Sequence, residues 1–91
     1  MNVIDIKHIE DCFDGSFIKE LLFDETVTPT FIEALGTHGK LQYFKDFARP
    51  FYKVVFRNDF YIKGVEGNTT ARILLRHERD IEYITQLINE S

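Results

Sequence analysis

The chain has 91 residues, of which 44% are hydrophobic, and a formal net charge of −4. This length suits a single domain, residues 1–91, and excludes a second one. The single cysteine, Cys12, excludes an internal disulfide, and no apolar run approaches the roughly 18 residues of a membrane span. Because the N-terminus also lacks the pattern of a signal peptide, we expect a protein of the reducing cytoplasm, without a membrane partner.

The charges are unevenly distributed along the chain. Residues 1–39 carry eight acids and two bases, whereas residues 40–79 carry nine bases and four acids. The negative total argues against a protein that coats nucleic acid by bulk attraction. The basic middle can pack near the acidic N-terminal third or meet an anionic partner, and charge blocks more often do the former.

The first elements expected along the chain are a strand and a short helix. Residues 2–9 alternate in polarity, which favours a strand. Asp14-Gly15 then marks a turn, and apolar residues recur at helical spacing behind Ser16, a good N-cap. This favours a helix, and the alternative is a hairpin about Asp14-Gly15 with residues 17–23 as its return strand.

Two further short helices are expected before the middle of the chain. Thr28 is a suitable N-cap, Pro29 suits the first helical position, and Gly36 can end this helix. On a helical wheel, residues 41–49 separate an aromatic arc from a charged arc. Pro50 would stop that helix, because the residue before a proline disfavours helical geometry.

The second half of the chain predicts strands followed by one helix. Its polarity alternates with a period of two over three segments, at about 51–57, 60–66 and 69–76. Asn58-Asp59 and Gly67-Asn68 are candidate two-residue turns, and residues 78–90 form an amphipathic helix. The predicted fold is therefore α+β: a three-stranded, or at most four-stranded, antiparallel sheet with the C-terminal helix on one face and short N-terminal helices.

Two-residue turns would fix which side chains share a face of this sheet. The first turn pairs Arg57 with Phe60. The second pairs Glu66 with Thr69. One face then suits the C-terminal helix and collects Phe51, Lys53, Val55, Arg57, Phe60, Ile62, Ala71, Ile73 and Leu75. The opposite face mixes aromatic, apolar and basic residues: Tyr52, Val54, Phe56, Tyr61, Lys63, Val65, Arg72, Leu74 and Arg76.

This mixed face is the candidate site, and three explanations compete for it. The acidic N-terminal third can cover it, a second copy can bind it, or single-stranded RNA or DNA can stack on it. The hypothesised binding residues are four aromatic or apolar residues with three bases at the edge: Tyr52, Phe56, Tyr61, Leu74, Lys63, Arg72 and Arg76.

No motif indicates catalysis, a metal site or a cofactor. Gly64-Val65-Glu66-Gly67 spells a Gly-x-x-Gly loop, but its place beside a hairpin turn and its acid favour a structural turn. His8 and Cys12 have too few neighbouring ligands for a metal site. A small enzyme using His8, Cys12 or His77 therefore has no supporting spacing.

The sequence predicts a small non-catalytic interaction or regulatory module. We expect it to self-associate, as a homodimer or higher homo-oligomer, or to bind a protein partner, through the mixed sheet face. The alternative is a single-stranded RNA- or DNA-binding domain that uses the same face. A small enzyme without a recognisable motif is the second alternative.

Overall fold

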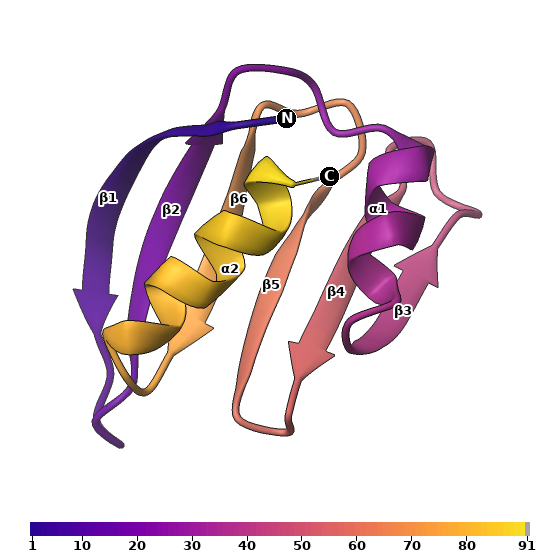
Figure 1. Cartoon of the computed structure of the whole chain (residues 1–91). Coiled ribbons are helices and arrows are strands. Elements are labelled where there is room, and N and C mark those ends of the chain that lie inside the picture. The colour runs from indigo at the N-terminus through magenta and orange to yellow at the C-terminus, as the bar shows by residue number, and fades with distance from the viewer. Residues whose placement is uncertain (91) are drawn as a thin grey trace.

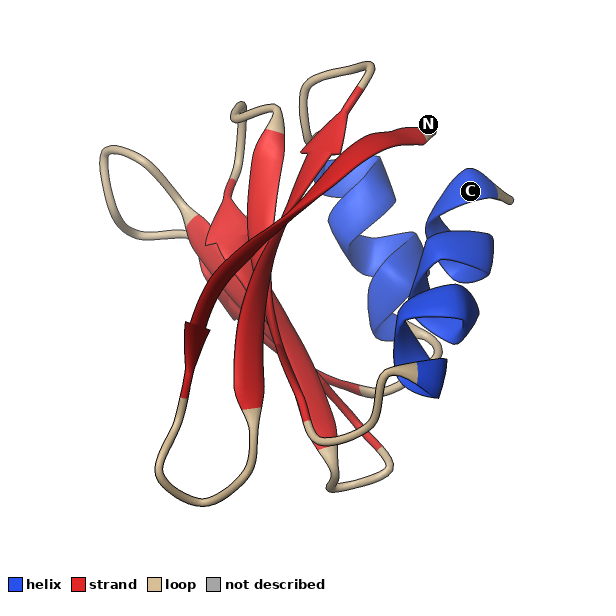
Figure 2. Cartoon of the chain, turned by 90° about the vertical axis from the view of Figure 1, so that its left-hand side faces the viewer, coloured by secondary structure: helices blue, strands red, loops and turns tan. Residues whose placement is uncertain are grey.

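The computed structural model describes residues 1–90, which form a six-stranded antiparallel sheet and two helices (Figure 1). The elements are β1 (Val3–Asp11), β2 (Phe17–Phe23), α1 (Pro29–Gly36), β3 (Lys40–Phe44), β4 (Phe51–Phe56), β5 (Phe60–Val65), β6 (Thr70–Leu75) and α2 (Arg79–Asn89). The strand order is β1-β2-β6-β5-β4-β3. Figure 2 shows both helices on the same side of the sheet. The prediction of only three or four strands was therefore wrong.

Strand β2 replaces the helix that was expected after Ser16. It pairs antiparallel with β1 and with β6, so the hairpin alternative was correct. At the turn, Gly15 has a φ of 88°, and the backbone N–H and hydroxyl of Ser16 both donate to the Asp14 carboxylate. These hydrogen bonds hold the pKa of Asp14 below its ordinary value. Because β2 is an internal strand with apolar residues on both faces, its pattern resembles that of a helix.

Strand β3 replaces the first part of the helix that was expected over residues 41–49. It pairs with β4, with Lys40 opposite Val55 and Phe44 opposite Phe51. Leu41 and Tyr43 pack against the core beneath the helices. The local pattern separates apolar from polar residues at the helical period and also at the strand period. The tertiary pairing with β4 therefore decides in favour of a strand.

The predictions that depend on helix caps, short turns and regular alternation in adjacent residues are confirmed. Helix α1 begins after Thr28, whose hydroxyl oxygen accepts the backbone N–H of Phe31 at 3.1 Å, and it ends at Gly36. Helix α2 lies within the predicted range, and β1 overlaps the first predicted strand. The predicted β5–β6 register is also correct, with Tyr61 opposite Leu74.

The β4–β5 hairpin turns one residue earlier than predicted. Arg57 and Asn58 both have a φ of 53°, and the Asp59 N–H donates to the Phe56 carbonyl at 3.0 Å. Two central residues with positive φ define a type I′ turn. Asp59 is an extra residue after the turn, so Phe56 lies opposite Phe60. The predicted register was wrong by one residue, which moves every β4 side chain to the other face.

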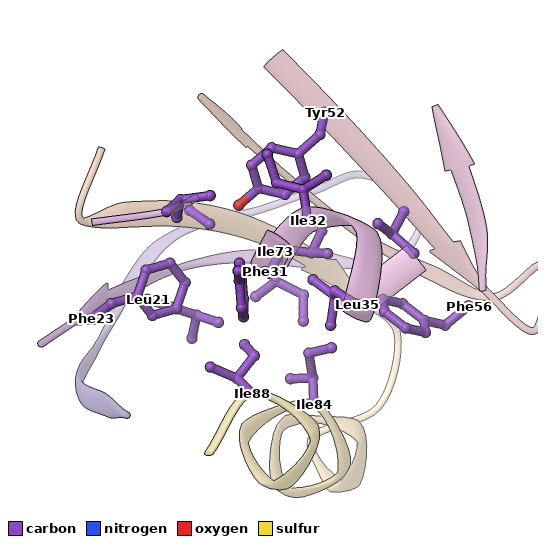
Figure 3. Packing of buried hydrophobic residues seen from close by; sticks show 14 of the residues in the cluster. Leu21, Phe23, Phe31, Ile32, Leu35, Tyr52, Phe56, Ile73, Ile84 and Ile88 are labelled. Atoms are coloured by element: carbon purple, nitrogen blue, oxygen red, sulfur yellow. The ribbon is translucent and has the colours of Figure 1, made fainter. Parts of the chain in front are cut away.

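The core lies between the sheet and the two helices. Figure 3 shows side chains from β2, β4 and β6 meeting those of α1 and α2 in this layer. The fully buried side chains include Leu21, Phe23, Ile32, Leu35, Tyr52, Val54, Phe56, Phe60, Ile62, Ile73, Leu75, Ile84 and Ile88. These β4 and β5 residues face the helices together because of the three-residue connection between their strands.

An ion pair between the exposed Arg57 and the buried Asp80 fastens the β4–β5 turn to the start of α2. The Arg57 guanidinium donates to the Asp80 carboxylate at 2.8 Å, and the Asp80 side chain is only 6% exposed. The same guanidinium lies over the rings of Phe60 and Tyr83, at 5.4 and 5.0 Å from their centroids. These contacts offset the cost of a left-handed backbone at Arg57.

Replacing Arg57 tests this fastening. We expect Arg57→Asn to lower the free energy of unfolding by about 1–3 kcal/mol, because the buried Asp80 carboxylate loses its charged partner. Asn tolerates the left-handed region, so backbone strain contributes little to the loss. Urea denaturation followed by circular dichroism measures it. If Arg57→Asn costs as much in an Asp80→Asn background as in the wild type, the ion pair is not the cause.

The Tyr52 ring packs against the bare backbone of Gly64. A Cβ atom at Gly64 would lie 2.8 Å from the Tyr52 hydroxyl oxygen. That hydroxyl is buried and has no hydrogen-bond partner within residues 1–90, and its burial raises the pKa of Tyr52. Gly64 therefore leaves room for an aromatic side chain from the directly opposite position of β4.

A double-variant cycle tests this packing. We expect Gly64→Ala to destabilise the fold by about 1–3 kcal/mol through overpacking. Tyr52→Phe removes an unsatisfied hydroxyl, so we expect a neutral or stabilising effect of up to about 1 kcal/mol. In the double variant, part of the Gly64→Ala cost should disappear, as measured by urea denaturation. Strictly additive effects would show that the hydroxyl and the added methyl do not compete for space.

Candidate binding site on the open sheet face

One side of the sheet carries no helix, and we call its β3–β6 portion the open face (Figure 2). Direct cross-strand pairing places a single set of side chains there. They are Lys40, Gln42, Phe44, Phe51, Lys53, Val55, Tyr61, Lys63, Val65, Thr70, Arg72 and Leu74. Four of these residues are cations and none is an acid. The open face is therefore positively charged although the chain as a whole is acidic.

Three exposed phenylalanines form a cluster at the β3–β4 end of this face. Phe44 and Phe51 lie opposite each other, with their rings stacked at 4.7 Å between centroids. Phe47 comes from the β3–β4 loop, and its ring lies 5.1 Å from that of Phe51. Phe44, Phe47 and Phe51 are 41%, 57% and 38% exposed. This phenylalanine cluster offers aromatic surface to the solvent.

This cluster was not predicted from the sequence. Phe44 and Phe47 were expected on a helix and Phe51 on the core face of the sheet. Period-two alternation over residues 40–44 is the signal that could have found Phe44, because it puts Leu41 and Tyr43 on the opposite side. No comparable local signal marks Phe47, which lies in a loop.

Three cations lie side by side across the middle of the open face. Lys53 is directly opposite Lys63, and Lys63 is directly opposite Arg72. We call these residues the cation row. Like charges at directly opposite positions repel each other at a Cβ separation of about 5 Å. The Lys53 ammonium lies over the Tyr61 ring at 4.2 Å, and Arg72 is 3.7 Å from Glu20.

Lys63 is the least compensated member of the cation row. It is exposed, it stands between two cations, and it forms no ion pair within the described residues 1–90. An anion bound beside Lys63 would relieve the repulsion along the row. The geometry therefore favours an anionic ligand at this position.

A shallow hollow of about 320 Å³ joins the cation row to the phenylalanine cluster. Phe51 and Val65 form part of its apolar lining, and Lys63, Arg72 and Glu20 form its charged lining. A smaller hollow of about 40 Å³ shares Lys63 and Arg72 and extends to Tyr61, Leu74 and Ile18. Aromatic and cationic groups therefore border two hollows that share Lys63 and Arg72.

The structure separates the predicted binding residues into three groups. Tyr61, Lys63, Arg72 and Leu74 lie together on the open face. Tyr52 and Phe56 lie on the other side, 1% and 0% exposed beneath the helices, because of the shifted β4–β5 register. Placing these two on the candidate face was wrong.

Arg76 follows β6 at one end of the sheet. Its guanidinium is 3.5 Å from the Asp14 carboxylate and 3.9 Å from that of Asp59. These two acids compensate its charge, unlike that of Lys63. Arg76 therefore belongs to the rim at the hairpin ends of the sheet.

Residues 1–39 do not cover the open face. They supply β1 and β2, which widen the sheet, and α1, which lies on the helix side (Figure 1). The explanation that this acidic third lies across the mixed face, one of three left open, was therefore wrong for the residues of the open face. Its acids do pair with bases of the middle segment at single points, namely Glu20 with Arg72, Asp14 with Arg76 and Glu33 with Lys45.

Tyr43 ties β3 to the turn after β5. Its hydroxyl donates to the Glu66 carboxylate, and the Lys45 ammonium lies 4.8 Å from its ring centroid. Burial and the neighbouring Glu66 carboxylate raise the pKa of Tyr43 to about 12. Glu66 therefore acts as a structural acceptor, in agreement with a structural turn at Gly64–Gly67.

The candidate ligands for a metal do not gather in the described part of the chain. Within residues 1–90, no three His, Cys, Asp or Glu side chains are placed to hold one ion. His8 approaches Asp11 at 3.4 Å, and Cys12 is a half-buried free thiol.

Comparison of the chain with protein-family models, with curated proteins and with solved structures finds no match. Of the helices in residues 1–90, none has the length and apolar character needed to cross a membrane. The residues of the open face are therefore the basis for inferring a function.

Proposed function

We propose that the protein is a non-catalytic module that binds single-stranded nucleic acid on its open face. The observation that carries this proposal is the exposed phenylalanine cluster beside the cation row, in which Lys63 forms no ion pair within residues 1–90. Single-stranded RNA and DNA combine flat bases with a chain of phosphates. Proteins that bind them without sequence preference pair aromatic side chains with a basic groove.

The two halves of the site match the two halves of such a ligand. Phosphates would lie along Lys53, Lys63 and Arg72, where an anion relieves repulsion between the side chains. Bases would stack on Phe51, which lines the hollow, and on Phe47, the most exposed ring of the cluster. Each base–aromatic contact contributes about 1–3 kcal/mol in comparable sites. Because neither contact identifies a base, we expect little sequence preference.

The acidic total charge of the chain does not oppose binding at this face. Charges farther apart than the Debye length, about 8 Å at physiological salt, are largely screened from each other. The open face carries four cations and no acid. Glu20 is the acid nearest the cation row, and its carboxylate already pairs with Arg72. Because Glu20 compensates Arg72, the positive potential at Lys63 comes mainly from Lys63 itself and the directly opposite Lys53.

Self-association through the open face is the second candidate, because the exposed phenylalanines could equally be buried by another copy. In a face-to-face dimer, Lys53 and Lys63 would lose water without gaining an acid from the β3–β6 portion of the partner. Burying unpaired charges is costly. This candidate stays a prediction, and it differs from the first in needing no ligand.

Fluorescence anisotropy with labelled oligothymidine and oligouridine tests the proposal. At about 50 mM salt, we expect binding that weakens steeply as salt rises. Phe47→Ala should reduce affinity about tenfold through lost stacking. Lys63→Ala should also weaken binding and should lower the slope of log affinity against log salt by about one phosphate contact.

The chain offers a matched control for each variant. Phe13 is a fully exposed phenylalanine at the tip of the β1–β2 hairpin, and Arg79 is an exposed cation at the start of α2. Phe13→Ala and Arg79→Ala should leave affinity within about twofold.

No binding at about 50 mM salt contradicts the proposal. Equal losses in the control variants would also do so, and concentration-dependent sedimentation abolished by Phe47→Ala would favour the second candidate.

A further inference from the structure

Strand β1 forms one edge of the sheet, and α2 lies close to it (Figure 1). A groove of about 550 Å³ runs between them and is lined by Ile6 with Ile81, Thr85 and Gln86. Ile6 lies directly opposite the buried Leu21 of β2, so its side chain is on the core side of the sheet. It is nevertheless 37% exposed. The edge therefore combines backbone groups that pair with no second strand with an apolar side chain, a combination that promotes strand pairing.

Bulges limit the part of β1 that can pair. Register shifts occur between Val3 and Asp5 and between His8 and Glu10, so only residues 5–8 are regular. Within this segment, the Ile6 N–H donates to the Asp5 carboxylate at 2.9 Å. A side chain of the same strand thus satisfies a backbone donor at the sheet edge. A partner strand could replace that acceptor with a backbone carbonyl.

We propose that β1 pairs antiparallel with β1 of a second copy, with the two-fold axis at Ile6. Antiparallel pairing about this residue places Asp5 opposite the partner's Lys7, and Lys7 opposite the partner's Asp5. Opposite charges at directly opposed positions stabilise a sheet. The two Ile6 side chains meet at the axis, on the side where each faces its own α2. This interface is isologous, as a closed two-fold dimer requires.

The charge pattern selects this register over its neighbours. Pairing centred on Lys7 would place that cation opposite itself, which is repulsive. At the other edge of the sheet, β3 paired with itself about Gln42 would gain no opposite charges. The regular segment of β1 is therefore self-complementary in charge only about Ile6.

The proposed dimer extends the sheet without using the open face. Asp5 and Lys7 lie opposite Leu22 and Glu20 on β2, outside the phenylalanine cluster and the cation row. The bulges keep the paired segment short, and Glu82 and Glu90 of α2 add acids beside the groove. The association is therefore weak and concentration-dependent, in line with a small interface.

Charge reversal within β1 tests the register. We expect the wild type to dimerise in sedimentation velocity experiments as its concentration approaches about 1 mM. Asp5→Lys alone and Lys7→Asp alone should each weaken association about tenfold or more, because both symmetric pairs become repulsive. An equimolar mixture of the two variants should form heterodimers, and the Asp5→Lys/Lys7→Asp double variant should recover the wild-type dimer.

Glu10→Lys provides the matched control. It changes the charge of β1 by the same amount as Asp5→Lys but lies beyond the regular segment, so it should leave association unchanged. A wild-type protein that stays monomeric at about 1 mM overturns the proposal. Equal effects of Glu10→Lys and Asp5→Lys, or no recovery in the mixture and the double variant, would also overturn it. None of these variants changes the phenylalanine cluster or the cation row, so failure here is separable from failure of nucleic-acid binding.

Discussion

The turn between β4 and β5 is the constraint on which both sides of the sheet depend. With Arg57 and Asn58 in the left-handed region and Asp59 as an additional residue, Phe56 pairs with Phe60. A connection one residue shorter or longer would turn Lys53 toward the helices. A lysine buried there without a partner would cost several kcal/mol, whereas β4 now buries Tyr52, Val54 and Phe56. Core packing and turn geometry thus select the same register.

The same turn also fixes where α2 begins. Arg57 reaches from the turn to Asp80 in the first turn of α2 and stacks on Tyr83 one helical turn later. The guanidinium therefore links the register of the β4–β5 hairpin to the docking of the C-terminal helix. Since α2 contributes Ile84 and Ile88 to the core, a displaced hairpin would also disturb the helix layer. One cationic side chain connects a local backbone conformation to the packing of two layers.

The lengths of the elements explain why one face stays open. Helices of eight and 11 residues are about 12 and 16 Å long, whereas six strands side by side span about 24 Å. Two such helices can cover one side of this sheet, and residues 1–90 contain no third helix. The side chains of the other face must therefore tolerate water or find a partner, and their mixture of phenylalanine and lysine is suited to both.

Features with local signals could be predicted from the sequence, whereas those set by distant pairing could not. The cap of α1 at Thr28 and the β5–β6 turn are determined by a few adjacent residues, and Tyr61, Lys63, Arg72 and Leu74 were therefore grouped correctly. In contrast, β2 and β3 have apolar residues at spacings that suit either a helix or a strand. Only pairing with their neighbours in the sheet determines that they form strands.

The β4–β5 register failed for a different reason. Asn58-Asp59 is the better two-residue turn by composition, because positive φ is uncommon at an arginine. Arg57 adopts it where its side chain gains Asp80 and two aromatic rings, all of which lie elsewhere in the sequence. The misplacement of Tyr52 and Phe56 thus follows from a tertiary contact that outweighs a local preference.

The order of charges across the sheet connects the two proposed surfaces. From β4 to β1, directly paired positions carry Lys53, Lys63, Arg72, Glu20 and Lys7. From Arg72 outward the signs alternate, and in the proposed dimer the partner's Asp5 continues that alternation beyond Lys7. At the other end, two lysines precede Arg72 without an acid between them. The acids therefore lie on the β1 side of Arg72, and Lys63, which stands between two cations, has the least compensated charge. This concentrates the attraction for an anionic ligand beside the phenylalanine cluster and away from the dimer edge.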